Sequence, residues 1–179
     1  MKRPTDRPFA LAAAVCLAAG LAVAAGCGYR LRGTGSGLPP GIKTLCVPMF
    51  RNQTTRYELD VKLTRAVINE LVARGRVRIG DDAAAADAVL TGEITGFQAN
   101  PIGFSGANQA DKYNITVTAR VTLKSRNAAE PLFDNPGFVY QQEYDVPPGS
   151  SFESVQTEAL DKIAGRFARS LVVSILEGF

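Results

Sequence analysis

A strict alternation of apolar and polar side chains runs through Asp111-Lys112-Tyr113-Asn114-Ile115-Thr116-Val117-Thr118-Ala119-Arg120-Val121-Thr122-Leu123-Lys124. From Tyr113 to Leu123 every odd-numbered position is apolar, and every even-numbered position from Asn114 to Lys124 is polar or charged. A period of two is typical of a β-strand that buries one face. The stretch therefore predicts a strand over 111–124 whose other face is wet or bound to another molecule.

Further strand patterns lie on both sides of this stretch, at 42–48, 76–79, 88–99 and 138–146. In the third of these, one face carries Ala88, Leu90, Gly92, Ile94 and Gly96, and its small residues would let a helix approach closely. In the last, one face carries Phe138, Tyr140, Gln142 and Tyr144. We expect loops at 49–54, at 100–110 and at 125–137.

Two segments have the apolar spacing of amphipathic helices. The first is predicted over 56–74, with Thr55 and Glu58 as a capping box and Gly75 as a left-handed C-terminal cap. The second is predicted from Phe152 to the C-terminus, after a capping box formed by Ser150 and Glu153. Both helices should cover one face of the sheet.

These elements predict an α+β two-layer sandwich in the order β-α-β-β-β-α. Its sheet has about four strands, is mixed but mostly antiparallel, and carries two helices on one face. The predicted domain organisation is a signal peptide at 1–26, a lipidated N-terminus at 27–41 with a short strand and a Gly/Pro spacer, and one sandwich domain at 42–179.

The N-terminus has the three parts of a secretion signal. Lys2, Arg3 and Arg7 precede an uncharged run that ends in small residues before Cys27. The run is Ala-rich and short for a membrane span. Its end resembles the bacterial lipoprotein processing box, although Ala24 stands where leucine is usual. The resemblance implies acylation of Cys27, and Gly28 after it implies sorting to the outer membrane.

The composition argues against catalysis and against several kinds of binding. The chain contains no histidine, so the commonest general base and metal ligand are absent. After signal removal only Cys27 and Cys46 remain, and Cys46 in its apolar run behaves as a small hydrophobe. Neither a thiolate-rich zinc site nor a clustered basic excess for nucleic acid is present. We predict no enzyme activity, no metal and no cofactor.

A pair of carboxylates is a catalytic arrangement that the sequence allows. Glu93 could meet Glu143 or Asp145 on the open sheet face if their strands pair. Ordinary cross-strand polar residues are the alternative, and we favour it.

Several segments together resemble the lipopolysaccharide-assembly lipoproteins of the LptE type. They are the Cys-Gly-Tyr-Arg-Leu-Arg-Gly opening at 27–33, the segment 38–44, the turn at 47–54, the strand at 88–94, and 110–113 leading into the Thr-rich strand. The resemblance implies a non-enzymatic outer-membrane lipoprotein, lipid-anchored on the periplasmic side. It would plug and help assemble a β-barrel translocon of the LptD type and bind lipopolysaccharide during its delivery to the outer leaflet.

The resemblance also suggests where phosphates of lipopolysaccharide would bind. Lys112, Arg120 and Lys124 lie on the Thr-rich face and are the candidate contacts. A solvated strand face, or contact with the barrel wall, explains the same residues equally well.

A second family likeness stays open. The segments 47–52, 74–77 and 86–92 are also similar to periplasmic domains of the curli-secretion lipoprotein and TolB N-terminal type. In those families the sandwich is a protein-docking or oligomer-forming module.

Overall fold

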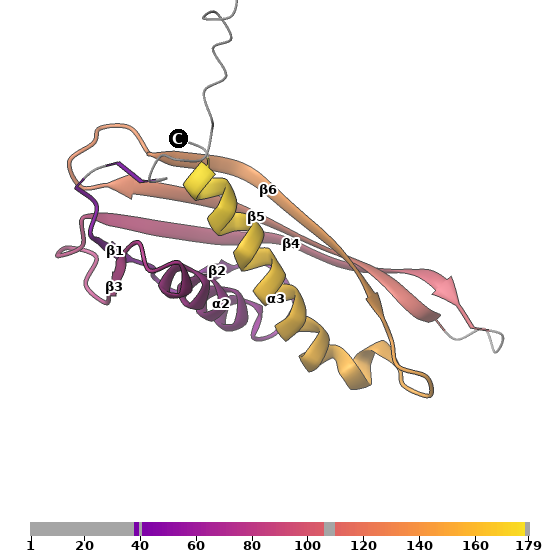
Figure 1. The fold of residues 1–179 in the computed structure, drawn as a ribbon. Helices are drawn as coiled ribbons and strands as arrows, with labels where there is room; N and C mark the ends of the chain where they lie inside the picture. Colours follow the sequence, from indigo (N-terminus) through magenta and orange to yellow (C-terminus); the bar gives the residue numbers. More distant parts are fainter. Residues whose placement is uncertain (1–37, 40, 106–109, 178–179) are drawn as a thin grey trace, which may run out of the picture. The chain divides into compact units, whose positions relative to one another are not determined.

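The computed structural model describes residues 38–39, 41–105 and 110–177 (Figure 1). The signal peptide, Cys27, the short strand expected before the spacer, and most of that spacer lie outside the described residues. Within them, the elements are β1 (Thr44–Cys46), β2 (Arg51–Asn52), α2 (Leu59–Arg74), β3 (Arg78–Gly80), β4 (Ala88–Phe104), β5 (Ala110–Ser125), β6 (Phe133–Asp145) and α3 (Phe152–Glu177).

The sheet is mixed, in the order β3-β1-β4-β5-β6, with β2 pairing separately with β4. β1 pairs in parallel with both β3 and β4, and β2 pairs in parallel with β4. The long strands pair antiparallel, β4 with β5 and β5 with β6. The predicted class is confirmed, but the strand count is wrong, because the sheet has six strands where about four were expected. One of them, β2, lies in the segment expected to be a loop; two paired residues leave no periodic pattern to recognise.

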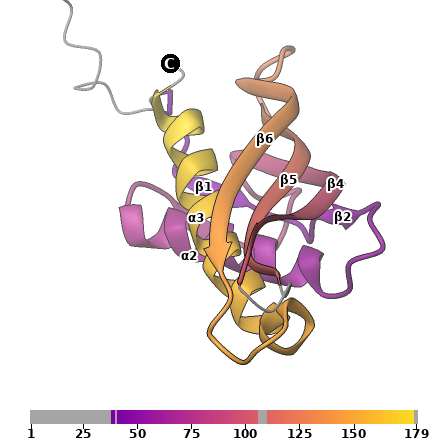
Figure 2. The same ribbon diagram turned by 90° about the vertical axis from the view of Figure 1, so that its right-hand side faces the viewer.

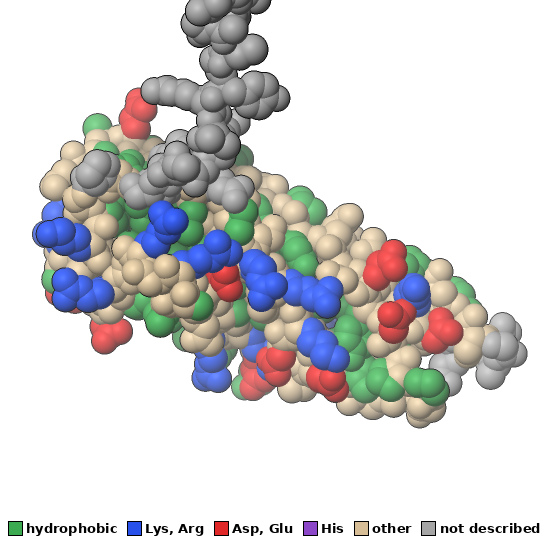
Figure 3. Space-filling model, in the orientation of Figure 1, with side chains coloured by type: hydrophobic (Ala, Val, Ile, Leu, Met, Phe, Trp, Pro, Cys, Tyr) green, Lys and Arg blue, Asp and Glu red, His purple; other side chains and the backbone are tan. Residues whose placement is uncertain are grey.

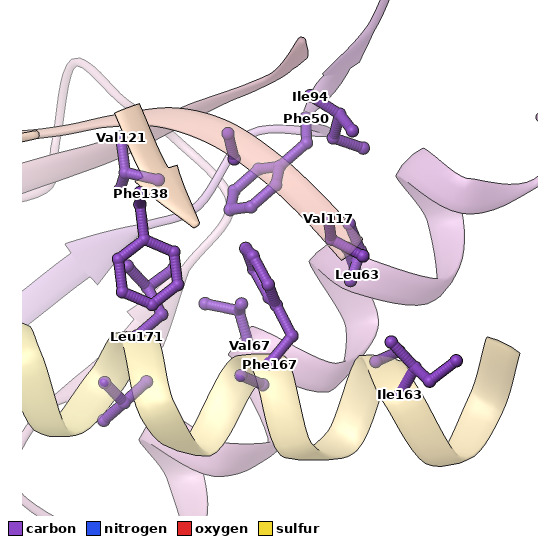
Figure 4. Close-up of a cluster of buried hydrophobic side chains, with 14 of the residues drawn as sticks. Phe50, Leu63, Val67, Ile94, Val117, Val121, Phe138, Ile163, Phe167 and Leu171 are labelled. Carbon is purple, nitrogen blue, oxygen red and sulfur yellow. The ribbon is translucent and has the colours of Figure 1, made fainter. Parts of the chain in front are cut away.

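Both helices lie on one face of the sheet, as expected (Figure 1, Figure 2). The apolar side chains of β5 pack on this side of the sheet. They are fully buried: Ile115, Val117, Ala119, Val121 and Leu123. On the helix side Phe167 of α3 stands edge-on to Phe138, with ring centroids 5.4 Å apart, and Figure 4 shows it at the centre of the buried cluster. None of the helices in the described ranges is long and apolar enough to cross a membrane.

The long strands extend further than predicted. β4 continues to Phe104 and β6 begins at Phe133, so parts of the expected loops at 100–110 and 125–137 are strand. A bulge in β4 between Ile94 and Gly96 shifts the alternation. Gly96 pairs with Thr118 on the open face, and Phe97 pairs with Val117 and packs on the core instead. Gly96 was therefore assigned to the wrong face, because a bulge reverses the alternation of every later residue.

Gly92 makes room for a phenylalanine ring and not for a helix, contrary to the sequence expectation. A Cβ atom at Gly92 would stand 2.7 Å from the Phe50 ring. Phe50 is 2% exposed and lies between β4 and α2, where its backbone N–H donates to the Thr64 hydroxyl at 2.9 Å. Figure 4 shows Phe50 pointing into the cluster beside Ile94.

The capping boxes differ from the prediction. Helix α2 begins at Leu59, because Glu58 has a left-handed backbone (φ 59°) and makes no side-chain cap. The preceding turn is organised by Asn52, whose Oδ1 accepts from the Thr54 backbone N–H at 2.9 Å and the Thr54 hydroxyl at 2.7 Å. At the other end, the predicted left-handed cap at Gly75 is confirmed.

The cap of α3 forms one residue later than predicted. The Ser151 hydroxyl accepts from the Ser154 N–H at 3.3 Å, and the Ser154 hydroxyl accepts from the Ser151 N–H at 3.1 Å. This is the reciprocal pattern of a capping box. It uses a serine where Glu153 was expected.

Candidate ligand and partner surfaces

Lys112 lies where β5 begins, opposite Asp145 of β6. Its Nζ is 3.4 Å from Asp145 Oδ1 and 3.8 Å from Glu143 Oε2, and all three side chains are well exposed. Two carboxylates therefore surround this candidate cation, and an incoming phosphate would have to compete with them.

Arg120 is paired across the strands with Glu93. The two residues are register partners between β4 and β5, and Arg120 Nη1 donates to Glu93 Oε2 at 3.1 Å. Glu93 Oε1 also accepts from Gln53 Nε2. The charge of Arg120 is therefore offset within the sheet.

Lys124 is exposed, and it has no acidic partner within the described ranges. It shares the open face with Lys112 and Arg120, but the three do not converge. Lys112 and Arg120 are eight residues apart on β5, which is about 26 Å along a strand. The structure thus places the three predicted residues on one face without making one phosphate cradle.

The rest of this open face is neutral and polar. Its threonine hydroxyls are partly used within the sheet: Thr91 and Thr95 donate to carbonyl groups of β5, and Thr122 donates to Asp134 at 2.8 Å. The face therefore carries hydroxyl groups and ion pairs, with little net charge.

The carboxylate pair that the sequence allows does not form. Glu93 lies opposite Arg120, whereas Glu143 lies opposite Asn114, six residues earlier on β5 and thus about 20 Å away. Among the described residues, no group of three His, Cys, Asp or Glu side chains could hold a metal ion. The alternative favoured from the sequence, ordinary cross-strand polar residues, is the observed arrangement.

Two further ionisable groups belong to the fold. The Asp87 carboxylate accepts hydrogen bonds from the backbone N–H groups of Lys43 and Thr44, at 2.9 and 2.8 Å, and from the Thr44 hydroxyl at 2.8 Å. These bonds lower the pKa of Asp87, and the bond from Lys43 has the largest effect. Cys46 is buried, and its burial, followed by Asp81 and Asp82, raises the pKa of the thiol. A raised pKa disfavours the reactive thiolate.

A groove between α2 and α3 carries charge that the sequence reading missed. It encloses about 810 Å³, and its lining includes Lys62, Arg65, Lys162, Arg166 and Arg169. Figure 3 shows blue side chains gathered over this helix face. The helical spacing of Lys162, Arg166 and Arg169 is visible in the sequence, but only the packing of α3 beside α2 brings them close to Arg65.

A family model described as lipopolysaccharide-assembly, LptE, matches residues 42–175. The chain belongs to this family. The match spans every described helix and strand except the last two residues of α3, and it confirms the resemblance found in the sequence. No curated protein matches the chain by sequence.

Solved structures of other proteins share this fold. The chain is similar to the PelC dodecamer from Paraburkholderia phytofirmans, with a TM-score of 0.50, 18% identity, and coverage of 80% of this chain and 92% of that one. It is also similar to the hypothetical protein CT253 from Chlamydia trachomatis, with a TM-score of 0.52, 11% identity, and coverage of 77% and 97%. At such identities these likenesses show the fold alone.

Proposed function

We propose that the chain is an outer-membrane lipoprotein that plugs and helps assemble a β-barrel translocon of the LptD type and binds lipopolysaccharide during its delivery to the outer leaflet. The match of the LptE family model over residues 42–175 carries this proposal. The protein acts without catalysis, through shape and surface.

The open sheet face suits this role physically. The lumen of a membrane barrel is lined by polar side chains, and the hydroxyls and ion pairs on β4, β5 and β6 can contact such a wall with Arg120 and Lys112 already paired. The acyl chains on Cys27 hold the protein at the periplasmic side of the membrane. One chain alone binds marginally, whereas the several chains of a processed lipoprotein make a stable anchor.

The most direct test recovers the partner. The tagged full-length protein is purified from outer membranes in mild detergent, and the co-purifying proteins are identified. We expect a large outer-membrane barrel in stoichiometric amount. Recovery of the protein without any barrel would overturn the proposal.

Lys112, Arg120 and Lys124 remain the proposed contacts for lipopolysaccharide, with Lys124 as the cation most ready to bind a phosphate because Arg120 and Lys112 are ion-paired. Neutralising Arg120 and Lys124 together, as Arg120→Gln and Lys124→Gln, should weaken lipopolysaccharide binding. Unchanged affinity would remove these residues from the site.

The fold likeness to a dodecamer favours a second candidate, an oligomer-forming or protein-docking periplasmic module. In that case the purified protein would form a homo-oligomeric ring or recover a soluble periplasmic partner. The mass of the purified protein in detergent distinguishes the two: a barrel complex supports the first function, and a ring of identical chains supports the second.

A further inference from the structure

Helices α2 and α3 lie side by side and run in the same direction. Arg56, in the turn before α2, donates to Gln156 of α3 at 2.6 Å, and Lys62 of α2 forms an ion pair with Asp161 further along α3. Beyond this ion pair, Arg65 of α2 and Gly165 of α3 line the same groove.

Most charges beside the groove are already paired. Lys62 pairs with Asp161, Glu70 pairs with Arg74 at 2.9 Å, and Lys162 pairs with Glu158 at 2.7 Å. Of the described residues that line the groove, Arg65, Arg166 and Arg169 are the cations without an acidic partner. Arg166 and Arg169 are three positions apart on α3 and therefore neighbours on its surface.

The position of these arginines creates an unbalanced positive site. All three are exposed, and they border the same groove from two helices. The only acid in the lining without an ion pair within the described ranges is Glu58, which lies before the first turn of α2. A bound anion would offset this excess of positive charge.

Gly165 adds a second observation. It lies in the middle of α3, where glycine is less favourable than alanine. A Cβ atom at this position would meet nothing within 4 Å, so no contact of the described chain requires a glycine here. Its effect is to keep the floor of the groove open beside Arg166.

We propose that this groove docks an acidic polypeptide segment, whose carboxylates bind Arg65, Arg166 and Arg169 and whose backbone lies over Gly165. The groove is long, since its α2 side extends from Glu58 to Ala73, about 22 Å of helix. Three guanidinium groups on two helices can bind several carboxylates at once, which an acidic chain presents and a single phosphate does not. Carboxylates accept two parallel hydrogen bonds from an arginine, which gives such a contact specificity.

The proposal rests on the proposed function in one respect, which is that the acidic segment belongs to the barrel partner. The test compares the full-length protein with a triple variant, Arg65→Glu, Arg166→Glu and Arg169→Glu. We expect the triple variant to recover about tenfold less barrel from outer membranes, and we expect rising salt to weaken the wild-type complex.

The matched control reverses three exposed arginines outside the groove, Arg51→Glu, Arg76→Glu and Arg78→Glu, with the same change in net charge. It should recover the barrel as the wild type does. Equal losses in the groove variant and the control would show a general charge effect and overturn the proposal. Thermal unfolding of each variant checks that the fold is retained.

Filling the groove is an independent test. Gly165→Leu should reduce barrel recovery without lowering the unfolding temperature, because the new side chain has open space around its Cβ. Gly80→Leu, at another glycine whose Cβ would meet nothing within 4 Å, should leave recovery unchanged. Normal recovery with Gly165→Leu contradicts docking over this residue.

The remaining outcomes separate the groove from the proposed function. If the wild type recovers no barrel, the proposed function fails, and the groove is tested with a fluorescein-labelled peptide of eight glutamates on the full-length protein in detergent. Binding that the triple variant loses supports an acidic segment from another protein, and absence of binding overturns it. If the triple variant keeps the barrel but loses binding to phosphatidylglycerol vesicles, the groove is a lipid headgroup site and the proposal is wrong.

Discussion

At the scale of single residues, one neighbouring side chain explains why position 92 requires glycine. The Phe50 ring occupies the space that a side chain would take, so the requirement for glycine comes from packing and not from backbone conformation. The sequence shows a small residue on a buried face, but it does not show which distant side chain fills the space. That information depends on how the segment before α2 folds back onto β4.

Gly92→Ala should therefore lower the free energy of unfolding by about 1–3 kcal/mol, because its Cβ would collide with the Phe50 ring. Chemical denaturation measures the change. Gly137→Ala is the matched control, since a Cβ there meets nothing within 4 Å. Adding Phe50→Leu to Gly92→Ala should recover part of the loss, and no recovery would show that the ring is not the cause.

Asp87 makes the stability of the fold depend on pH. Its hydrogen bonds from Lys43 and Thr44 lower its pKa in the folded state, so the unfolded chain takes up a proton first as the pH falls. The stabilisation is present above the unfolded pKa, about 4, and is lost as the pH falls through the lower folded pKa.

We expect Asp87→Asn to be less stable than the wild type at neutral pH, with the difference shrinking below about pH 4. Unfolding free energies measured across this range test it. Glu130→Gln, at an exposed carboxylate in the loop before β6, should follow the wild-type profile. A constant difference between wild type and Asp87→Asn at all pH values would contradict the account.

At the scale of elements, the strand that decides the fold was predictable and its neighbours were less so. The period of two in β5 gave the correct buried face because β5 has no bulge between Lys112 and Lys124. In β4 a bulge reversed the alternation after Ile94, and an inserted residue leaves no mark in the sequence pattern. The helix stripes were predictable, but their first turns were not, because several serines and threonines near each start could act as the cap.

The cap of α3 gives a test at this scale. Ser151→Ala should lower the unfolding free energy by about 0.5–2 kcal/mol, because the N–H of Ser154 loses its bond to the Ser151 hydroxyl and keeps the Ser151 carbonyl as its acceptor. Ser174→Ala in the same helix is the control. The Ser174 hydroxyl donates to the Ser170 carbonyl, a bond that does not stabilise a helix, so its loss should be neutral or slightly favourable. Equal effects of the two substitutions would contradict the assigned cap.

At the scale of the whole molecule, the candidate surfaces depend on register and packing. Lys112, Arg120 and Lys124 share a face as expected, but their ion pairs follow from which residues of β4 and β6 lie opposite. The arginines of the helix groove belong to segments a hundred residues apart. A linear pattern shows each helix face separately, and it does not show how two faces meet.

The last prediction at this scale concerns the proposed lipid anchor on Cys27. Cys27→Ser should abolish acylation and release the protein from the membrane into the periplasm, because the acyl chains are its proposed anchor. Fractionation of cells followed by detection of the tagged protein measures this, and Cys46→Ser is the control cysteine. Membrane attachment of Cys27→Ser in cells that lack a barrel partner would contradict lipid anchoring.

The edges of the sheet have a consequence for self-association of the protein. At one edge β3 is only three residues long, and at the other β6 carries Pro136, a register shift beside Ala119, and the acidic side chains Asp134, Glu143 and Asp145. Short strands, prolines, bulges and charges all oppose strand addition by another chain. The same edges that end the sheet therefore disfavour amyloid-like self-association of the protein.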